Sequence, residues 1–131
     1  MGRALRWLLA AGFTVTAACG GEKPPVGPVA GDLILAYGSP NTADGAVLIL
    51  VTGGPISSVT PIGGYQVAFA PAGVNATRLV VTGNLVTGDV VRLRVPDVSA
   101  SGNYSGRVEA AADRNTFALS DPGFYTTGIR R

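Results

Sequence analysis

The sequence predicts an all-β domain, a small antiparallel β-sandwich of about eight to nine short strands. From Asp32 onward, short runs of Val, Ile, Leu and Thr are interrupted about every 8–12 residues by Gly, Pro, Asn and Asp. Several of these runs alternate apolar with polar residues, as strands with one buried face do. One run, residues 46–51, is apolar throughout, which is typical of a central strand covered on both faces. Two sheets packed face to face satisfy all three observations.

The strands expected from these runs follow one another closely along the chain. In chain order they cover residues 33–37, 46–52, 57–61, 65–70, 77–82, 90–95, 104–111, 116–119 and 124–129. The breaks between them contain turn formers such as Gly53-Gly54-Pro55 and Gly63-Gly64. Residues 107–114 also allow a helix, because Val108, Ala111 and Ala112 would then form one apolar stripe.

The alternation also predicts which side chains face the core. They are Tyr65, Val67 and Phe69; Val91, Leu93 and Val95; and Tyr104, Gly106, Val108 and Ala110. Tyr37 and Tyr125 are expected to bury their rings as well, because sheet proteins rarely leave large aromatic surfaces in water.

The first 18 residues have the layout of an export signal. Arg3 and Arg6 give a basic start, residues 7–18 are apolar, and Ala17-Ala18 form a small-residue cleavage site. The apolar segment is well short of the about 20 residues that a helix needs to cross a bilayer. We therefore expect a signal peptide over residues 1–18.

The segment Val15-Thr16-Ala17-Ala18-Cys19 resembles the lipobox of bacterial lipoproteins, with Thr16 where Leu is usual. The resemblance implies cleavage between Ala18 and Cys19 and acylation of Cys19, which would anchor the chain in a membrane. Gly20, in place of the Asp that tends to retain such proteins at the inner membrane, implies the outer membrane or cell surface. The alternative is an ordinary secretory signal cut near Ala18, which would leave a free thiol.

The remaining chain divides into a tether and a domain. Residues 19–31 are rich in Pro and Gly and read as a flexible linker, and residues 32–131 form the domain. Removing the leader also removes two of the ten basic residues and none of the eight acidic ones, so the remaining chain is formally neutral. A neutral domain has no long-range field to attract nucleic acid, and we expect none as a partner.

The side-chain inventory excludes several chemistries. The chain has no His, one Cys and one Lys, so His-based nucleophile pairs, His zinc sites and disulfide frameworks are not possible. We expect no cofactor and no catalytic residue. Two alternatives stay open: a carboxylate pair of Glu109 with Asp89, Asp97 or Asp113, and a calcium site built from loop residues. The loop candidates are Asn41, Asp44, Asp113, Asn115 and Asp121, for which ordinary turn hydrogen bonds are the simpler expectation.

Three arginines suggest a possible ligand surface. If residues 77–82 and 90–95 form a hairpin with Thr82 opposite Val90, Arg78 lies opposite Arg94 on the outer face, with Arg92 nearby. Like charges directly opposed are unfavourable. Either Glu109 or a neighbouring Asp neutralises them, or an anionic glycan or acidic partner does.

The order of these segments is similar to that of cohesin-type β-sandwich surface modules. The similarity rests on residues 44–48, 53–59, 78–85 and 88–96. It implies a non-catalytic module that binds another protein. We therefore expect a lipid-anchored envelope protein that binds or scaffolds a protein or glycan at the cell surface. The alternatives are a structural or envelope-assembly lipoprotein without a discrete ligand, and a small glycan-acting enzyme.

Overall fold

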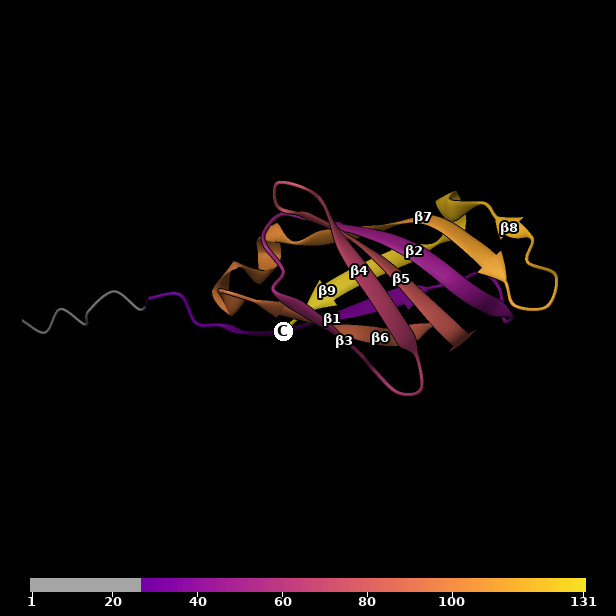
Figure 1. The fold of residues 1–131 in the computed structure, drawn as a ribbon, viewed down its shortest axis with the longest axis horizontal. Coiled ribbons are helices and arrows are strands. Elements are labelled where there is room, and N and C mark those ends of the chain that lie inside the picture. The colour runs from indigo at the N-terminus through magenta and orange to yellow at the C-terminus, as the bar shows by residue number, and fades with distance from the viewer. Residues whose placement is uncertain (1–26) are drawn as a thin grey trace, which may run out of the picture.

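A computed structural model of the chain describes residues 27–131 and confirms the β-sandwich (Figure 1). One antiparallel sheet has the strand order β3-β6-β1-β9 and the other the order β4-β5-β2-β7-β8. The strands are β1 (Gly31–Gly38), β2 (Asp44–Thr52), β3 (Ser58–Pro61), β4 (Gln66–Gly73), β5 (Ala76–Leu85), β6 (Gly88–Val95), β7 (Ser105–Asp113), β8 (Leu119–Ser120) and β9 (Thr126–Arg130). Two short 3-10 helices, η1 (Val98–Asn103) and η2 (Pro122–Phe124), lie in the connections.

The nine predicted strands correspond to β1–β9, with differences near the C-terminus. Residues 107–114 are not helical, because β7 pairs with β2 on one side and with β8 on the other. The strand predicted over residues 116–119 is a loop as far as Ala118, and β8 holds only Leu119 and Ser120. Asp121 accepts a hydrogen bond from the Gly123 amide and caps η2, so β9 begins only at Thr126.

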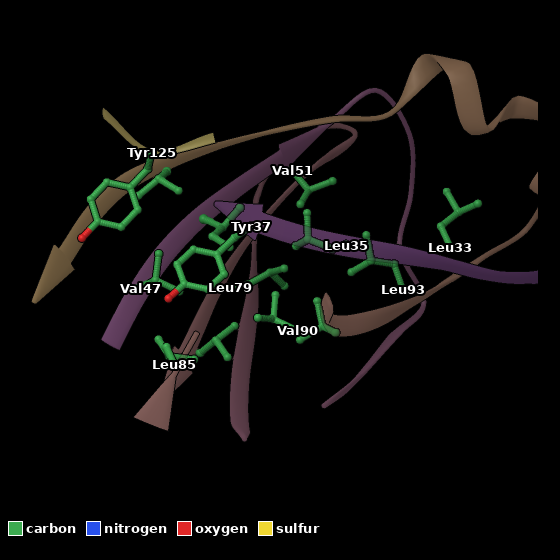
Figure 2. Close-up of a cluster of buried hydrophobic side chains, with 14 of the residues drawn as sticks. Leu33, Leu35, Tyr37, Val47, Val51, Leu79, Leu85, Val90, Leu93 and Tyr125 are labelled. Carbon is green, nitrogen blue, oxygen red and sulfur yellow. The ribbon is translucent and has the colours of Figure 1, made fainter. Parts of the chain in front are cut away.

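The core lies between the two sheets (Figure 2). The inward side chains of β2, Val47, Ile49 and Val51, are fully buried, and β2 lies between β5 and β7 as expected of a central strand. Its outward residues Leu48 and Leu50 are only half-buried, so the predicted covering of both faces is complete on the inner face and partial on the outer face. The predicted burial of the tyrosine rings is confirmed for Tyr37, Tyr104 and Tyr125.

A β-bulge changes the alternation in β7. Ile49 of β2 lies opposite Val108, but the next residue, Leu48, lies opposite Ala110, so Glu109 is an extra residue. A bulge shifts the inward and outward sides of the strand that follows it. Ala111 is therefore buried, whereas Ala110, predicted to face the core, is on the outward side.

The hairpin predicted for residues 77–82 and 90–95 does not exist. β5 pairs with β2 and β4 in the five-stranded sheet, and β6 pairs with β1 and β3 in the four-stranded sheet. The short connection through Val86 and Thr87 carries the chain from one sheet to the other. Alternation assigns side chains to faces and leaves the pairing partner open, which is why the sequence did not predict this crossing.

Candidate interaction surface

The outer face of the five-stranded sheet carries a continuous band of small and aliphatic side chains. In register, Leu48 of β2 lies between Val80 of β5 and Ala110 of β7, and Ala68 of β4 lies beyond Val80. The adjacent row places Ala46 beside Ala112. We refer to this band as the apolar face, and its residues are Ala46, Leu48, Ala68, Val80, Ala110 and Ala112.

The apolar face is accessible and shallowly hollowed. Val80 is 40% exposed although it lies on an inner strand of the sheet. One hollow of about 170 Å³ lies over β2, β5, β7 and β8, and another of about 270 Å³ lies over β2, β4 and β5. Leu48 and Val80 line both hollows, so they form the centre of the surface.

Two large side chains extend the apolar face at the β8 end. Leu119 is 80% exposed and lies opposite Ala112, and Phe117 is also 80% exposed. Phe117 has a positive φ of 57°, which is uncommon for a bulky residue, and it lines a hollow of about 420 Å³ together with Ala46 and Ala112. Apolar surface of this kind, outside a core, is typical of interaction sites.

Charged side chains border the apolar face at the other end. Arg78 and Arg107 both lie opposite Leu50, one on each neighbouring strand. The Arg78 Nε donates to Glu109 Oε2 at 3.2 Å. The other carboxylate oxygen of Glu109 is buried and has no hydrogen-bond partner within residues 27–131. An apolar centre with a charged border is the usual composition of a protein interface.

The outer face of the four-stranded sheet is polar by contrast. Arg92 and Arg94 of β6 are exposed there, and Arg94 lies 3.5 Å from Asp32. The Arg130 guanidinium donates to both carboxylate oxygens of Asp89, at 2.8 and 2.6 Å, and holds the pKa of Asp89 below its usual range.

The structure therefore separates the three arginines that the sequence grouped. Arg78 belongs to the five-stranded sheet and Arg92 and Arg94 to the other, so Arg78 does not face Arg94. Glu109 neutralises Arg78, as one of the two sequence-based alternatives stated, and Asp32 neutralises Arg94.

Asp44 is the one buried charged side chain within residues 27–131. A bulge at Gly45 shifts the alternation of β2, so Asp44 points into the core rather than outward. Tyr125 donates to Asp44 Oδ1 at 2.9 Å, and Tyr37 donates to Oδ2 at 3.4 Å. The Ser39 hydroxyl also donates to Oδ2.

These donors lie on or beside the strands of the four-stranded sheet, whereas Asp44 belongs to the five-stranded sheet, so their hydrogen bonds connect the two sheets. Tyr37 is the second-last residue of β1 and Tyr125 directly precedes β9, whereas Asp44 begins β2. The two tyrosine rings stack with their centroids 6.3 Å apart, and Figure 2 shows them together at one end of the core. Burial, reinforced by the Asp44 carboxylate, raises the pKa of Tyr37 above its usual value. Both carboxylate oxygens of Asp44 accept hydrogen bonds from hydroxyl groups. We therefore interpret this cluster as a structural connection between the two sheets.

The other candidate carboxylates make local hydrogen bonds. Asp113 accepts from the amides of Thr116 and Asn115, which lower its pKa, and Asp121 accepts from Gly123. Asp97 accepts from the hydroxyl and amide of Ser99, which lower its pKa. Turn hydrogen bonds were the expectation for these aspartates and are confirmed, while Asp44 and Asp89 have the other partners described above.

The structure does not gather the candidate ligands into a metal site. Asn41 donates to the Tyr125 hydroxyl at 3.0 Å and to the Ser120 hydroxyl at 3.1 Å, so it supports the Asp44 cluster. Asp44 and Asp113 are opposite each other in register, but their carboxylates bind different donors. Across residues 27–131 no group of three or more acidic side chains is placed to hold a metal ion.

Ala18 and Cys19, the predicted cleavage and lipidation site, lie outside the described residues. Within residues 27–131 there is no helix with the length and apolar character needed to span a bilayer. Comparisons of the chain with protein-family models, with curated proteins and with solved structures found no match. The similarity to cohesin-type modules therefore stays an expectation from the sequence.

Sequence reasoning missed the apolar face itself. Ala68 and Val80 were visible as outward residues of their strands, but Ala110 was assigned to the core. Phe117 was placed inside a strand, and Phe69, predicted to be buried, is 45% exposed at the sheet edge. The signal was the lack of polar residues at the outward positions of residues 46–51 and 110–112, which can be interpreted only once the strand order is known.

Proposed function

We propose that this protein is a lipid-anchored component of the cell envelope, displayed at the outer membrane, that binds another surface component through the apolar face. The observation that carries the proposal is the band from Ala68 through Val80 and Leu48 to Ala110 on the outer face of one sheet, while the outer face of the other sheet is charged. Ala68 and Val80 are exposed, and Leu48 and Ala110 are half-buried. A sheet face with no role in binding needs polar outward residues in water, as β6 has with Arg92 and Arg94.

The position of the surface is compatible with display on a tether. In Figure 1 the described chain begins at one end of the sandwich, and β8 lies at the opposite end. Leu119, which begins β8, therefore lies far from the point where the described chain begins. A partner reaching this end would not have to pass between the domain and the membrane.

The partner that fits this surface is a protein with a flat aliphatic patch bordered by acidic and basic side chains. Small residues such as Ala68 and Ala110 allow close approach of another backbone or side chain. Arg107 and Glu109 at the border provide charges of both signs that fix orientation.

Photo-crosslinking in native envelopes tests the binding face. A photoreactive residue at Val80 should give a discrete adduct, whereas one at the exposed Thr60 on the other sheet should not. Leu48→Asp should remove the Val80 adduct without unfolding the domain, because Leu48 points outward. Equal adducts from positions 80 and 60, or an adduct unaffected by Leu48→Asp, would contradict the proposed face.

The anchor is tested separately from the binding face. Metabolic labelling with a fatty acid should label the wild-type chain and not Cys19→Ala, and only the wild type should sediment with membranes. Two or more acyl chains hold a protein on a bilayer stably, at about 0.8 kcal/mol per buried CH₂. Sedimentation of an unlabelled Cys19→Ala chain with membranes would contradict the anchor and leave the binding face untouched.

A further inference from the structure

The four edges of the two sheets differ in how well they are protected against pairing with another strand. β8 is two residues long, β3 is four residues long and ends in Pro61, and β9 carries Arg130 near the end of the chain. Short strands, prolines and charges are the usual means of blocking an edge. β4, at the remaining edge, has eight residues, none of which is charged, and its one proline, Pro71, lies toward the C-terminal end of the strand.

Within residues 27–131, β4 pairs with β5 alone, so its other side is unpaired. A register shift between Pro71 and Gly73 disrupts its C-terminal end, which leaves residues 66–70 as a regular edge. Ala68, Phe69 and Ala70 are exposed, and Phe69 exposes 45% of its surface. Unpaired backbone groups on a regular apolar edge are a template for strand addition.

We propose that the occupant of this edge is β4 of a second copy of the chain, paired antiparallel about a two-fold axis at Ala68. In that register Gln66 lies opposite Ala70 of the other copy, and Val67 lies opposite Phe69. Side chains directly opposite each other share a face, so each Phe69 covers the half-buried Val67 of the other copy. The two five-stranded sheets become one continuous sheet.

The composition of the edge favours a second copy. No charge lies within residues 66–73, so two identical strands meet without like-charge repulsion. Ala68, at the axis, is small enough to meet itself. A two-fold interface uses the same patch on both molecules, and this edge is self-complementary in that sense. Self-pairing requires neither the lipid anchor nor the partner proposed above, and it would place two apolar faces side by side.

The strength of the association follows from the size of the contact. Five residues on each side bury less than the roughly 1,200 Å² found in stable interfaces. We therefore expect a dissociation constant of about 10–100 µM, which is measurable by sedimentation equilibrium of the full chain in a non-ionic detergent.

Two matched double variants test the edge. Ala68→Glu with Ala70→Glu places acidic groups on both sides of the proposed contact and should weaken dimerisation at least about tenfold. Ser58→Glu with Thr60→Glu makes the same change on the exposed positions of β3 and should leave the dimer unchanged. Both pairs add two acidic groups to an edge strand beside arginines, since Ala70 lies opposite Arg78, and Ser58 and Thr60 lie opposite Arg94 and Arg92. Ala68 differs in lying opposite the uncharged Val80.

Cysteine cross-linking in a Cys19→Ser chain tests the register. Ala68→Cys should form a disulfide with its own copy, since directly opposed Cα atoms lie about 4.5–5.5 Å apart. Gln66→Cys and Ala70→Cys should each fail alone, because each residue then lies about 13 Å from itself, yet they should cross-link when mixed.

Three results would overturn the proposal. The wild-type chain could stay monomeric throughout the concentration range, or glutamates at positions 68 and 70 could leave its dimerisation unchanged. Cross-linking could also occur from Leu48→Cys and Val80→Cys but not from Ala68→Cys, which would mean that the faces stack and the edges stay apart. The first two results bear neither on fatty-acid labelling of Cys19 nor on adducts formed at position 80, whereas the third would assign the adduct at position 80 to a second copy of the chain.

Discussion

At the scale of single residues, Asp44 shows how a small polar cluster can fix the relation between two sheets. Its carboxylate accepts hydrogen bonds from the hydroxyl groups of Ser39, Tyr37 and Tyr125. Its own strand, β2, belongs to the five-stranded sheet, whereas β1 and β9 belong to the four-stranded sheet. No Arg or Lys of residues 27–131 forms an ion pair with it. A buried carboxylate is stable only when its hydrogen bonds are complete, so the cluster depends on every member.

Asp44→Ala should destabilise the protein by about 3 kcal/mol, because it leaves three buried or half-buried hydroxyl groups without their acceptor. Urea unfolding of the full chain in detergent measures the loss. Asp121→Ala is the control, because Asp121 is exposed and caps only the short helix η2, where about 1 kcal/mol is expected. Equal losses in the two variants would mean that the Asp44 cluster has no special role.

The stability of the protein should also fall in alkali because of Tyr37. The folded-state pKa of Tyr37 is raised above the unfolded value of about 10, so its contribution is complete below pH of about 10. As the pH rises from there toward the folded-state pKa, the unfolded chain loses the proton first, and stability falls by about 1.4 kcal/mol per pH unit.

Denaturant unfolding at a series of pH values from neutral into alkali measures this slope. Tyr37→Phe should have a lower stability at neutral pH and a shallower slope in alkali, because it has no phenol to ionise there. The same alkaline slope in Tyr37→Phe as in the wild type would assign the effect to other tyrosines, such as Tyr104, whose pKa burial also raises.

At the scale of elements, two bulges decide which residues reach the core and which form the apolar face. The bulge at Gly45 turns Asp44 inward, and the bulge at Glu109 turns Ala111 inward and Ala110 outward. Each bulge inserts one residue, and because the side-chain period of a strand is two, one residue exchanges the two faces.

The phase of β7 after its bulge can be tested with two adjacent alanines. Ala111→Asp should cost about 3 kcal/mol or more, because it places a carboxylate in the core. Ala110→Asp should cost less than about 1 kcal/mol, since residue 110 points to solvent. Chemical denaturation compares them, and unbroken alternation along β7 predicts the reverse order.

At the scale of the whole molecule, the two sheets share one core but differ in their outer surfaces. The four-stranded sheet carries Arg92 and the ion pairs of Arg94 with Asp32 and of Arg130 with Asp89. The five-stranded sheet carries the apolar face and the open edge of β4. Both of the proposed contacts therefore lie on one sheet. The other sheet has a charged outer face and contributes its inward side chains to the shared core.

Because the sheets share their core, a cavity in either should destabilise both. Leu35→Ala in β1 and Leu79→Ala in β5 each remove a fully buried side chain and should cost about 2–5 kcal/mol. Hydrogen exchange of the slowest amides should accelerate equally in the two sheets of each variant, as expected for one cooperative unit. Acceleration confined to the mutated sheet would mean that the sheets open independently.

The sequence by itself determined the fold class, the nine strands and most of the core, because apolar alternation and turn residues are local properties of the chain. The alternation of Leu93 with Arg92 and Arg94 was enough to assign Leu93 to the core, whatever the partner strand. The export and lipidation signal at Cys19 is likewise local, and it stays a prediction outside the described residues.

Only the tertiary structure decided which strands are neighbours, where the bulges fall and what each sheet presents to solvent. Pairing joins residues far apart in the chain, so β5 and β6, separated by two residues, could belong to different sheets. The apolar face needs Leu48, Val80 and Ala110 side by side, and that proximity is created by hydrogen bonding between strands that no local pattern specifies.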